Sequence, residues 1–364
     1  MKILFVASEG LPFSKTGGLA DVVEALPKAL VAMGHEVSVV LPRYRNTKAS
    51  AVVLPSLTIP TGDGLRFPAV ADGTAVAGVR YFFVDDPDYF DRDQLYSVQG
   101  KDYPDNAERF AEFSRAAVEI AKHVYPADVI HCHDWQSALV PVLLRTLYES
   151  DPVLRGVPVV FTIHNMGYHG LYPREALKRL GLPEKLFHMD AMEFYGKVNF
   201  LKGALVFADY LTTVSRKYAQ EIQTPEYGHG LEGVIHQRAE HLFGILNGVD
   251  YSAWSPETDT FIAARYSPKD LSGKRVCKRD LLVQFRSSSG TQPAVQVSLH
   301  QRVGKPEVAR LTRDLKQHGG RDSSIEWLGS SLTAHDLGHQ LELELGPGHR
   351  SHAQPPSNLL VDSS

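Results

Sequence analysis

The sequence predicts an α/β protein built on a doubly wound parallel sheet, and three features lead to this prediction. Continuous apolar runs recur along residues 1–245, as is typical of strands covered on both faces. Segments of helical period lie between these runs. Polar or glycine-rich residues follow several of the runs. Strands and helices that alternate in this way predict right-handed crossovers, with helices on both sides of one Rossmann-like sheet.

The first strand and helix are the clearest elements. MKILFVAS is a continuous apolar run, and from Leu19 to Met33 apolar residues recur at helical spacing until Gly34 closes the helix. The elements expected after them are strands at 35–42 and 79–86, a helix at 106–125, a strand at 127–134, a helix at 137–148, a strand at 157–165, a helix at 193–208, and strands at 210–215 and 241–250.

Composition restricts the class of protein. The chain has 364 residues, of which 43% are hydrophobic, and a net charge of −4, which gives no general attraction to nucleic acid or to anionic membranes. The two cysteines, Cys132 and Cys277, form no disulfide framework, the chain enters its first strand directly, and no apolar run reaches membrane-spanning length. We therefore expect a cytoplasmic protein without nucleic-acid or membrane partners.

The pattern changes after the last predicted strand. We expect a Rossmann-like domain at 1–245, an interdomain linker and the start of a second domain at 246–282, and an atypical tail at 283–364. In the tail apolar periodicity is intermittent, and its end is rich in Pro, Ser and His. Such composition is typical of disorder.

The stretch FSKTGGLADV places Lys15, Gly17 and Gly18 at the turn between the first strand and the first helix. Such a turn lies at the carboxyl edge of the sheet, where open α/β folds bind ligands and a helix start presents unpaired N–H groups. Phosphate is the ligand that fits best. The spacing is neither GxxxxGK[ST] nor GxGxxG, so the two commonest nucleotide loops are excluded, and an ordinary structural turn stays a second interpretation.

Three further polar residues, Asp134, His164 and Asn247, also follow predicted strands, so they can converge with Lys15 on one crevice. His164 can donate a hydrogen bond to a hydroxyl or act as acid or base, or it can be structural. Asn247 precedes a glycine and can instead serve a tight turn.

The motif HCHDW, residues 131–135, offers four potential metal ligands within four positions. Because neighbouring strand residues face opposite sides, they cannot all reach one ion, so no metal is expected. Asp134 and Trp135 are better interpreted as entering the crevice to hydrogen-bond to a sugar and to stack on it. The remaining alternative is a packed histidine with Asp134 capping a helix.

Six segments resemble bacterial glycogen synthases and plant starch synthases in their order and approximate spacing. They are SKTGGLADVVEALPKAL, HCHDWQSAL, FTIHNMGYHG, GKVNFLKGALVFADYLTTVS, HGLEGVI and ILNGVDYSAWSPETD. The resemblance runs from Met1 to about Leu282. The resemblance implies a retaining glucosyltransferase of the GT-B type, with two Rossmann-like domains across a cleft. Glucose passes from ADP-glucose to the non-reducing end of an α-1,4-glucan, with no cofactor and no metal.

On the donor side, the resemblance implies that Lys15, Gly17 and Gly18 lie against the diphosphate and the glucose. His164 matches the family's active-site histidine, which contacts the donor glucose, and Asn247 matches the asparagine of the NGVD motif on the sugar side.

On the acceptor side, Asp134 and Trp135 match residues that line the family's glucan site. The family is thought to proceed by same-face attack in which the leaving phosphate assists the acceptor hydroxyl, so no carboxylate nucleophile is expected. Without a metal, cations and helix N-termini must stabilise the departing diphosphate.

The chain departs from the family after Leu282. An Arg and a Lys that clamp the phosphates, and a glutamate loop with a Cys-Gly pair, should follow, but neither an SR…QKG nor an E…PCGL stretch occurs. Two functions stay open: a truncated glycogen synthase, inactive by itself, or a non-catalytic single-domain remnant that at most binds glucan or donor weakly. Another nucleotide-sugar transferase is disfavoured by KTGGLAD together with HDW.

Overall fold

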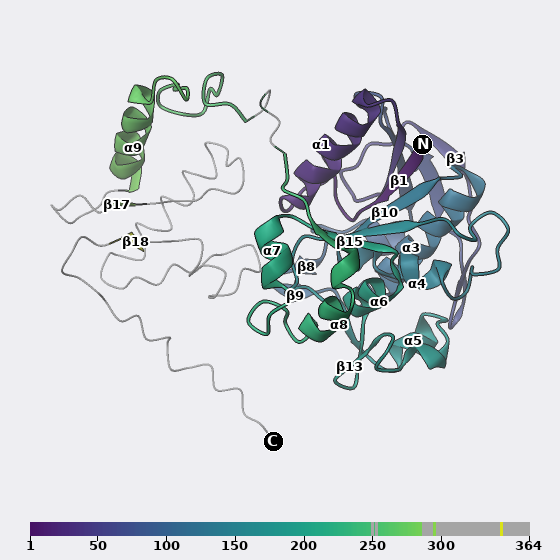
Figure 1. Cartoon of the computed structure of the whole chain (residues 1–364). Helices are drawn as coiled ribbons and strands as arrows, with labels where there is room; N and C mark the ends of the chain where they lie inside the picture. The colour runs from purple at the N-terminus through teal and green to yellow at the C-terminus, as the bar shows by residue number, and fades with distance from the viewer. Residues whose placement is uncertain (249–250, 252–253, 286–293, 296–342, 345–364) are drawn as a thin grey trace. The chain divides into compact units, whose positions relative to one another are not determined.

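A computed structural model describes residues 1–248, 251, 254–285, 294–295 and 343–344. The chain divides into two compact units, Met1–Val249 and Asp250–Ser364 (Figure 1). The first unit contains every residue that the sequence places in the candidate site.

A nine-stranded sheet forms the centre of the first unit, in the order β16-β15-β11-β10-β1-β2-β7-β6-β3 (Figure 1). All neighbours from β16 to β7 pair in parallel, which confirms the predicted α/β fold. The strands are β1 (Lys2–Val6), β2 (Glu36–Pro42), β3 (Ala51–Leu54), β6 (Ala69–Asp72), β7 (Arg80–Asp85), β10 (Val129–His133), β11 (Val159–Ile163), β15 (Tyr210–Thr213) and β16 (Leu242–Gly244).

One edge of the sheet is antiparallel, which the sequence did not predict. β6 pairs antiparallel with β7, and β3 pairs antiparallel with β6. Both strands come from the connection between β2 and β7, which also contains the hairpin of β4 (Ile59–Thr61) and β5 (Gly64–Arg66). Antiparallel neighbours need only short turns between them, so this long connection extends the sheet without a crossover helix.

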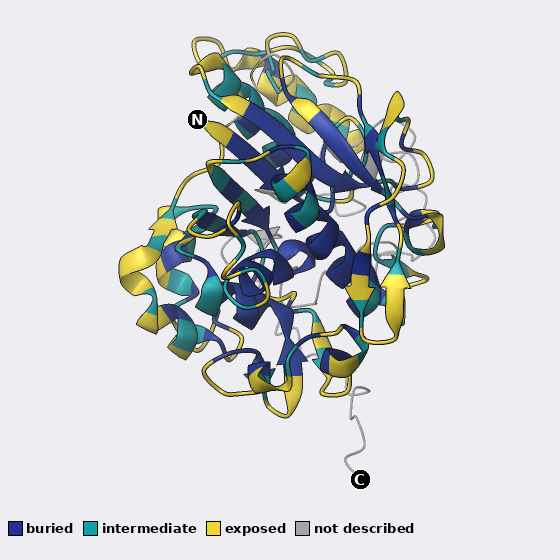
Figure 2. Cartoon of the chain, turned by 90° about the vertical axis from the view of Figure 1, so that its right-hand side faces the viewer, coloured by how far each residue is buried: buried dark blue, intermediate teal, exposed yellow. Residues whose placement is uncertain are grey.

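Helices cover both faces of the sheet, and the alternation along β1 shows how. Ile3 and Phe5 belong to the core beneath α1 (Leu19–Ala32), whereas Leu4 and Val6 belong to the larger core on the other face. The helices of that larger core include α3 (Asn106–His123), α4 (Leu139–Leu144) and α6 (Phe200–Phe207). Figure 2 shows the strands buried between the two layers.

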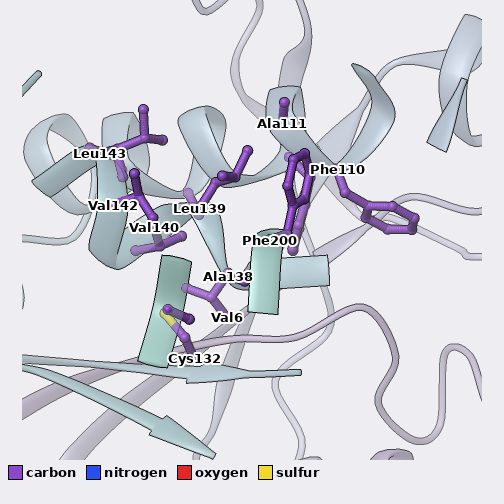
Figure 3. Close-up of a cluster of buried hydrophobic side chains, with 14 of the residues drawn as sticks. Val6, Phe110, Ala111, Cys132, Ala138, Leu139, Val140, Val142, Leu143 and Phe200 are labelled. Carbon is purple, nitrogen blue, oxygen red and sulfur yellow. The ribbon is translucent and has the colours of Figure 1, made fainter. Parts of the chain in front are cut away.

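The larger core is made by short apolar helices. Figure 3 shows Leu139, Val142 and Leu143 of α4 packed with Phe110 of α3 and Phe200 of α6. These five side chains are at most 1% exposed, and burying each contributes about 1.5–3 kcal/mol. This packing supports β10 and β11 from behind, so the ends of those strands are held rigidly.

The other elements of the first unit are short and connect the layers. They are α2 (Pro87–Phe90), β8 (Ser97–Val98), β9 (Lys101–Asp102), η1 (Trp135–Ser137), β12 (Leu171–Pro173), α5 (Ala176–Arg179), η2 (Glu184–Leu186), β13 (Glu193–Phe194), β14 (Lys197–Asn199), α7 (Arg216–Glu221), α8 (Glu232–Gln237) and η3 (Ala239–His241).

The helix predicted at 193–208 begins later than expected. β13 and β14 pair antiparallel around Tyr195 and Gly196, whose φ angles of 49° and 78° make a tight turn. The side chain of Asn199 then accepts the backbone N–H of Lys202 and caps α6, which starts at Phe200. The turn and the cap together interrupt the apolar period that suggested one helix.

The described residues of the second unit include one helix, α9 (Ser272–Phe285). There, β17 (Ala294–Val295) pairs antiparallel with β18 (Leu343–Glu344). The thiol of Cys277 donates to the carbonyl of Ala264 at 3.0 Å. Of the tail predicted at 283–364, only 283–285, 294–295 and 343–344 lie within the described residues.

Candidate active site at the carboxyl edge of the sheet

The topology brings the predicted site residues to one edge. Lys15 follows β1, Asp134 follows β10, His164 follows β11 and Asn247 follows β16, and these strands are parallel members of one continuous run in the sheet. Only β10 separates β1 from β11, so their strand ends are about 10 Å apart. Asp134 and His164 are in direct contact, since Asp134 Oδ1 accepts the His164 backbone N–H, whereas Lys15 and Asn247 lie in segments that follow other strands of the same edge.

At the turn of Gly17 and Gly18, neither the backbone conformation nor the surrounding side chains require glycine. Gly18 has φ −71°, and a Cβ built on it would meet no atom within 4 Å. A Cβ on Gly17 would meet only Glu9 Oε1, at 3.8 Å, and its φ is not in the left-handed region. Neither backbone conformation nor packing within the described residues therefore excludes a side chain at these positions.

Lys15 lies beside the start of α1. Its Nζ is 2.6 Å and 2.7 Å from the two carboxylate oxygens of Asp21, which belongs to the first turn of α1. Both side chains are partly exposed. The ion pair orients the ammonium group toward the helix N-terminus, where an anion would meet both the lysine charge and the positive end of the helix dipole.

Glu9 stabilises the turn at Gly17 and Gly18. It was not among the site residues predicted from the sequence. The side chain is buried, and its Oε2 accepts the backbone N–H of Thr16. Burial raises the pKa of Glu9, and the nearby carboxylate of Asp134 raises it further. Glu9 could have been found by the same rule that found Asp134, because it too is a polar residue directly after a buried strand.

Asp134 has an unusual backbone conformation. Its φ of 56° with ψ of 179° lies in a region that non-glycine residues rarely adopt, at a cost on the order of 1–3 kcal/mol. The conformation lets Oδ1 accept the backbone N–H of His164 at 2.8 Å. Burial raises the pKa of Asp134, while the neighbouring His164 opposes that rise. Backbone strain of this kind is concentrated at functional sites.

His164 is held by a second histidine, which sequence reasoning treated only as a packed residue. Nε2 of His164 lies 3.0 Å from Nδ1 of His133, the last residue of β10. Burial lowers the pKa of both rings, that of His133 well below its usual range. His164 is therefore a neutral imidazole near pH 7, able to donate or accept a hydrogen bond but not to supply a positive charge.

Two of the predicted residues lie in contrasting surroundings. Trp135 is 8% exposed and belongs to the larger core, with its ring centroid 5.0 Å from that of Phe110 and 6.3 Å from that of Tyr172. Its indole therefore packs mainly against protein, and stacking on a sugar stays a prediction. Asn247 is exposed, in the segment that follows β16.

Within the part of the chain that the structure describes, no group of three or more His, Cys, Asp or Glu side chains is placed to hold a metal ion. In HCHDW, the reason lies in the strand: Cys132 points into the larger core, and the neighbouring rings of His131 and His133 pack against Phe5. The same described residues include no helix long and apolar enough to cross a membrane.

Comparison with known proteins agrees with this geometry. Residues 2–237 match the family described as the starch synthase catalytic domain. The chain belongs to this family. As a member of the starch synthase family, it has the parallel α/β sheet and the strand-end residues expected from the motifs, which all fall within or just beyond the matched segment.

Relatives of this starch synthase family member are longer than the chain itself. The glycogen synthase of Koribacter versatilis (strain Ellin345) is 58% identical over 299 residues, which cover 82% of this chain and 62% of that protein. The glycogen synthase of Myxococcus xanthus (strain DK1622) is 46% identical over 304 residues, which cover 80% and 62%. The chain thus spans about 62% of the length of these relatives.

A solved structure shows the same architecture. The catalytic domain of starch synthase IV from Arabidopsis thaliana, bound to ADP and acarbose, superposes with a TM-score of 0.66 and 36% identity. The match covers 80% of this chain and 60% of that one. The fold of this family member therefore corresponds to part of a starch synthase catalytic domain.

Proposed function

We propose that the chain is the N-terminal half of a glycogen synthase that transfers glucose, with retention, from ADP-glucose to the non-reducing end of an α-1,4-glucan. The observation that carries the proposal is the turn at Gly17 and Gly18. Two adjacent side chains are missing although nothing in the described protein excludes them, beside a lysine and a helix N-terminus. A diphosphate held against the backbone explains all three features.

On the donor side, the proposal assigns Lys15, Gly17 and Gly18 to the diphosphate and the glucose, and Asn247 to the sugar. Lys15 adds a point charge to the field of the α1 N-terminus, and together they favour the negative charge that develops on the departing phosphate. His164 contacts the donor glucose. Because burial lowers its pKa, it acts there as a neutral hydrogen-bonding partner for a hydroxyl.

On the acceptor side, the proposal assigns Asp134 and Trp135 to the glucan. Asp134 fits this role because its carboxylate is held in place by the His164 backbone N–H, at the end of β10 where a sugar hydroxyl would approach. Trp135 acts through the rim of its ring, since most of its surface is packed. The leaving phosphate takes the proton of the attacking hydroxyl, so the chemistry needs no carboxylate nucleophile, metal or cofactor from this chain.

A second candidate is a non-catalytic remnant that at most binds glucan or donor weakly. It is favoured by the lack of SR…QKG and E…PCGL stretches after Leu282. For either candidate we propose a cytoplasmic location and no nucleic-acid or membrane partner, in keeping with the net charge of −4.

The deciding experiment measures incorporation of labelled glucose from ADP-glucose into glycogen. The 364-residue chain is compared with a fusion that carries the second half of the Koribacter relative after Leu282. The chain alone should be at least about a hundredfold slower, because several groups that stabilise charge are missing at once. An active fusion supports the synthase, whereas comparable activity of both proteins contradicts the assignment of the missing half.

A calorimetric titration separates the remnant from the synthase. If the fusion is inactive, but the chain binds maltooligosaccharide or ADP-glucose, the second candidate is supported. Lys15→Ala in the active fusion should raise the donor KM by about 10- to 100-fold, the equivalent of one charge-assisted contact worth about 1.5–3 kcal/mol. An unchanged donor KM contradicts the diphosphate assignment.

A further inference from the structure

His133 lies directly behind His164, and we propose that it is a positioning residue that decides which ring nitrogen of His164 carries the proton. Nδ1 of His133 is 3.0 Å from Nε2 of His164, and the two ring centroids are 5.3 Å apart. The proposal rests on the proposed function only in its last step, where the proton on His164 meets a sugar hydroxyl.

The ring of His133 is held in one orientation. Its side chain is fully buried, and the ring stacks on Phe5 with centroids 5.4 Å apart and planes 18° from parallel. Its backbone N–H donates to Ser137 Oγ at 2.7 Å, and the Ser137 hydroxyl donates back to the His133 carbonyl at 2.8 Å. Burial and stacking on Phe5 restrain the ring with Nδ1 facing His164.

Both rings are neutral near pH 7, because burial lowers the pKa of each. A neutral imidazole has one N–H and one bare nitrogen, so the contact between the rings has two possible arrangements. In the first, Nδ1–H of His133 donates to Nε2 of His164. In the second, Nε2–H of His164 donates to Nδ1 of His133.

The other nitrogen of His133 distinguishes the two arrangements. Nε2 of His133 is buried and has no hydrogen-bond partner among the residues that the structure describes. In the second arrangement this atom would carry the proton, as a buried N–H without an acceptor; in the first it is only a bare acceptor. Buried N–H groups without a partner are rarer in proteins than acceptors that lack one. The geometry thus favours donation by His133.

Donation by His133 sets the tautomer of His164. Since its Nε2 accepts from His133, its single proton lies on Nδ1, whereas a free neutral histidine prefers the proton on Nε2. His133 therefore maintains the less common tautomer and makes His164 a hydrogen-bond donor through Nδ1. In the proposed synthase this N–H is the group that a donor-sugar hydroxyl meets.

A neighbouring residue provides a matched control. His131 lies on the same strand, two residues before His133, and its ring centroid is 4.3 Å from that of His133. Its Nε2 bonds instead to Thr162 Oγ1 at 2.7 Å. Replacing His131 therefore disturbs the same packing layer without removing a hydrogen bond from His164.

The experiment records long-range ¹H–¹⁵N correlation spectra of the 364-residue chain labelled with ¹⁵N-histidine at about pH 7.5, above the ordinary histidine pKa. The His164 signals are assigned with His164→Gln. Three variants are compared: His133→Leu, which cannot donate; His133→Asn, whose amide nitrogen occupies the place of Nδ1; and the control His131→Asn. Near-UV circular dichroism verifies that each variant is folded.

The unsubstituted chain, His133→Asn and His131→Asn should show His164 protonated at Nδ1, and His133→Leu should shift the proton to Nε2. A His164 protonated at Nε2 in the unsubstituted chain, or unchanged in a folded His133→Leu, overturns the proposal. If His133→Leu does not fold, the unsubstituted chain decides: His164 protonated at Nδ1 together with a ¹⁵N–¹⁵N coupling between the two rings supports the proposal, and the absence of either overturns it. None of these spectra requires activity, so failure of the proposed function is detected separately, by the transfer assay.

Discussion

The two edges of the parallel sheet are built in opposite ways. At the amino edge, Arg145 pairs with Asp209 at 2.5 Å, and the same carboxylate accepts the Val159 backbone N–H at 2.7 Å. At the carboxyl edge, Asp134 has a strained backbone, and a ring nitrogen of His133 is buried without a partner in the described part of the chain. The first edge satisfies its polar groups, whereas the second retains strain and unpaired atoms.

Arg238 illustrates how the polar groups of the amino edge are satisfied by hydrogen bonds. Its guanidinium donates to the carbonyls at the end of α6 and just beyond it, those of Leu205, Val206, Ala208 and Asp209, at 2.7–3.1 Å. Such capping stabilises a helix C-terminus and interacts favourably with its dipole. The comparison shows that stability and function are assigned to opposite edges of one sheet. The amino edge contributes stabilising contacts, and the carboxyl edge contains locally unfavourable features at the candidate functional residues.

The sharpest test of this contrast removes the ring of His164. In the active fusion, His164→Ala should lower kcat by about 10²–10⁴-fold, the range for losing a positioned hydrogen-bonding or proton-transfer group. Initial-rate kinetics with ADP-glucose and glycogen measure the effect. Arg145→Ala at the amino edge is the control, and a decrease of similar size in that variant would show that the two edges do not differ in function.

The second test removes a group from the amino edge. Arg238→Ala should lower the free energy of unfolding by about 2–3 kcal/mol, because the helix end loses charge-assisted hydrogen bonds. Urea denaturation of the 364-residue chain measures the change. In the fusion, the kcat of Arg238→Ala should equal that of the unsubstituted protein when it is measured at urea concentrations below the unfolding transition. An Arg238→Ala chain with an unchanged free energy of unfolding would contradict the structural role. A fusion variant that loses kcat without losing stability would contradict it as well.

The third test concerns the strain at Asp134. Because φ is 56° there, Asp134→Gly should be more stable than Asp134→Ala by about 1–2 kcal/mol, although glycine usually destabilises relative to alanine. Both variants lose the bond to the His164 backbone, so their difference isolates the backbone term. Equal unfolding free energies, or a more stable alanine variant, would show that the backbone at this position is not strained.

The smallest effect is a dependence on pH. Burial lowers the pKa of His131 to about 3, so below about pH 6.5 the unfolded chain binds a proton that the folded chain does not. Stability from this residue is thus complete above pH 6.5 and lost as the pH falls toward 3. The measured quantity is the unfolding free energy of the unsubstituted chain minus that of His131→Asn. It should decrease by about 1.4 kcal/mol for each unit by which the pH falls below 6.5.

This comparison is made as a difference because buried carboxyls act in the opposite sense. Burial raises the pKa of Glu9 and of Asp134, so their protonated folded forms gain stability as the pH falls. Both proteins contain these carboxyls, and their contribution cancels. A difference that stays constant between pH 6.5 and 5 would contradict the neutral, buried state of His131.

Much of the fold could be predicted from the sequence because its determinants are local. An apolar run such as residues 1–8 is typical of a covered strand, and the period that starts at Leu19 is typical of a helix. Parallel strands share one carboxyl edge, which is why Lys15 and His164 could be assigned to the same edge of the sheet without coordinates. The turn at Tyr195 and Gly196 was missed because apolar period outweighed turn chemistry in that segment.

The sequence by itself determined the covered parallel sheet, the identity of the polar residues after its strands, and the family to which they belong. Only the tertiary structure decided that Glu9 supports the glycine turn, that Trp135 is packed in the core and that His133 faces His164. The last contact joins residues 31 positions apart, and it depends on the register in which β10 pairs with β11. That register is set by packing against α3, α4 and α6, so no local pattern in the chain reveals it.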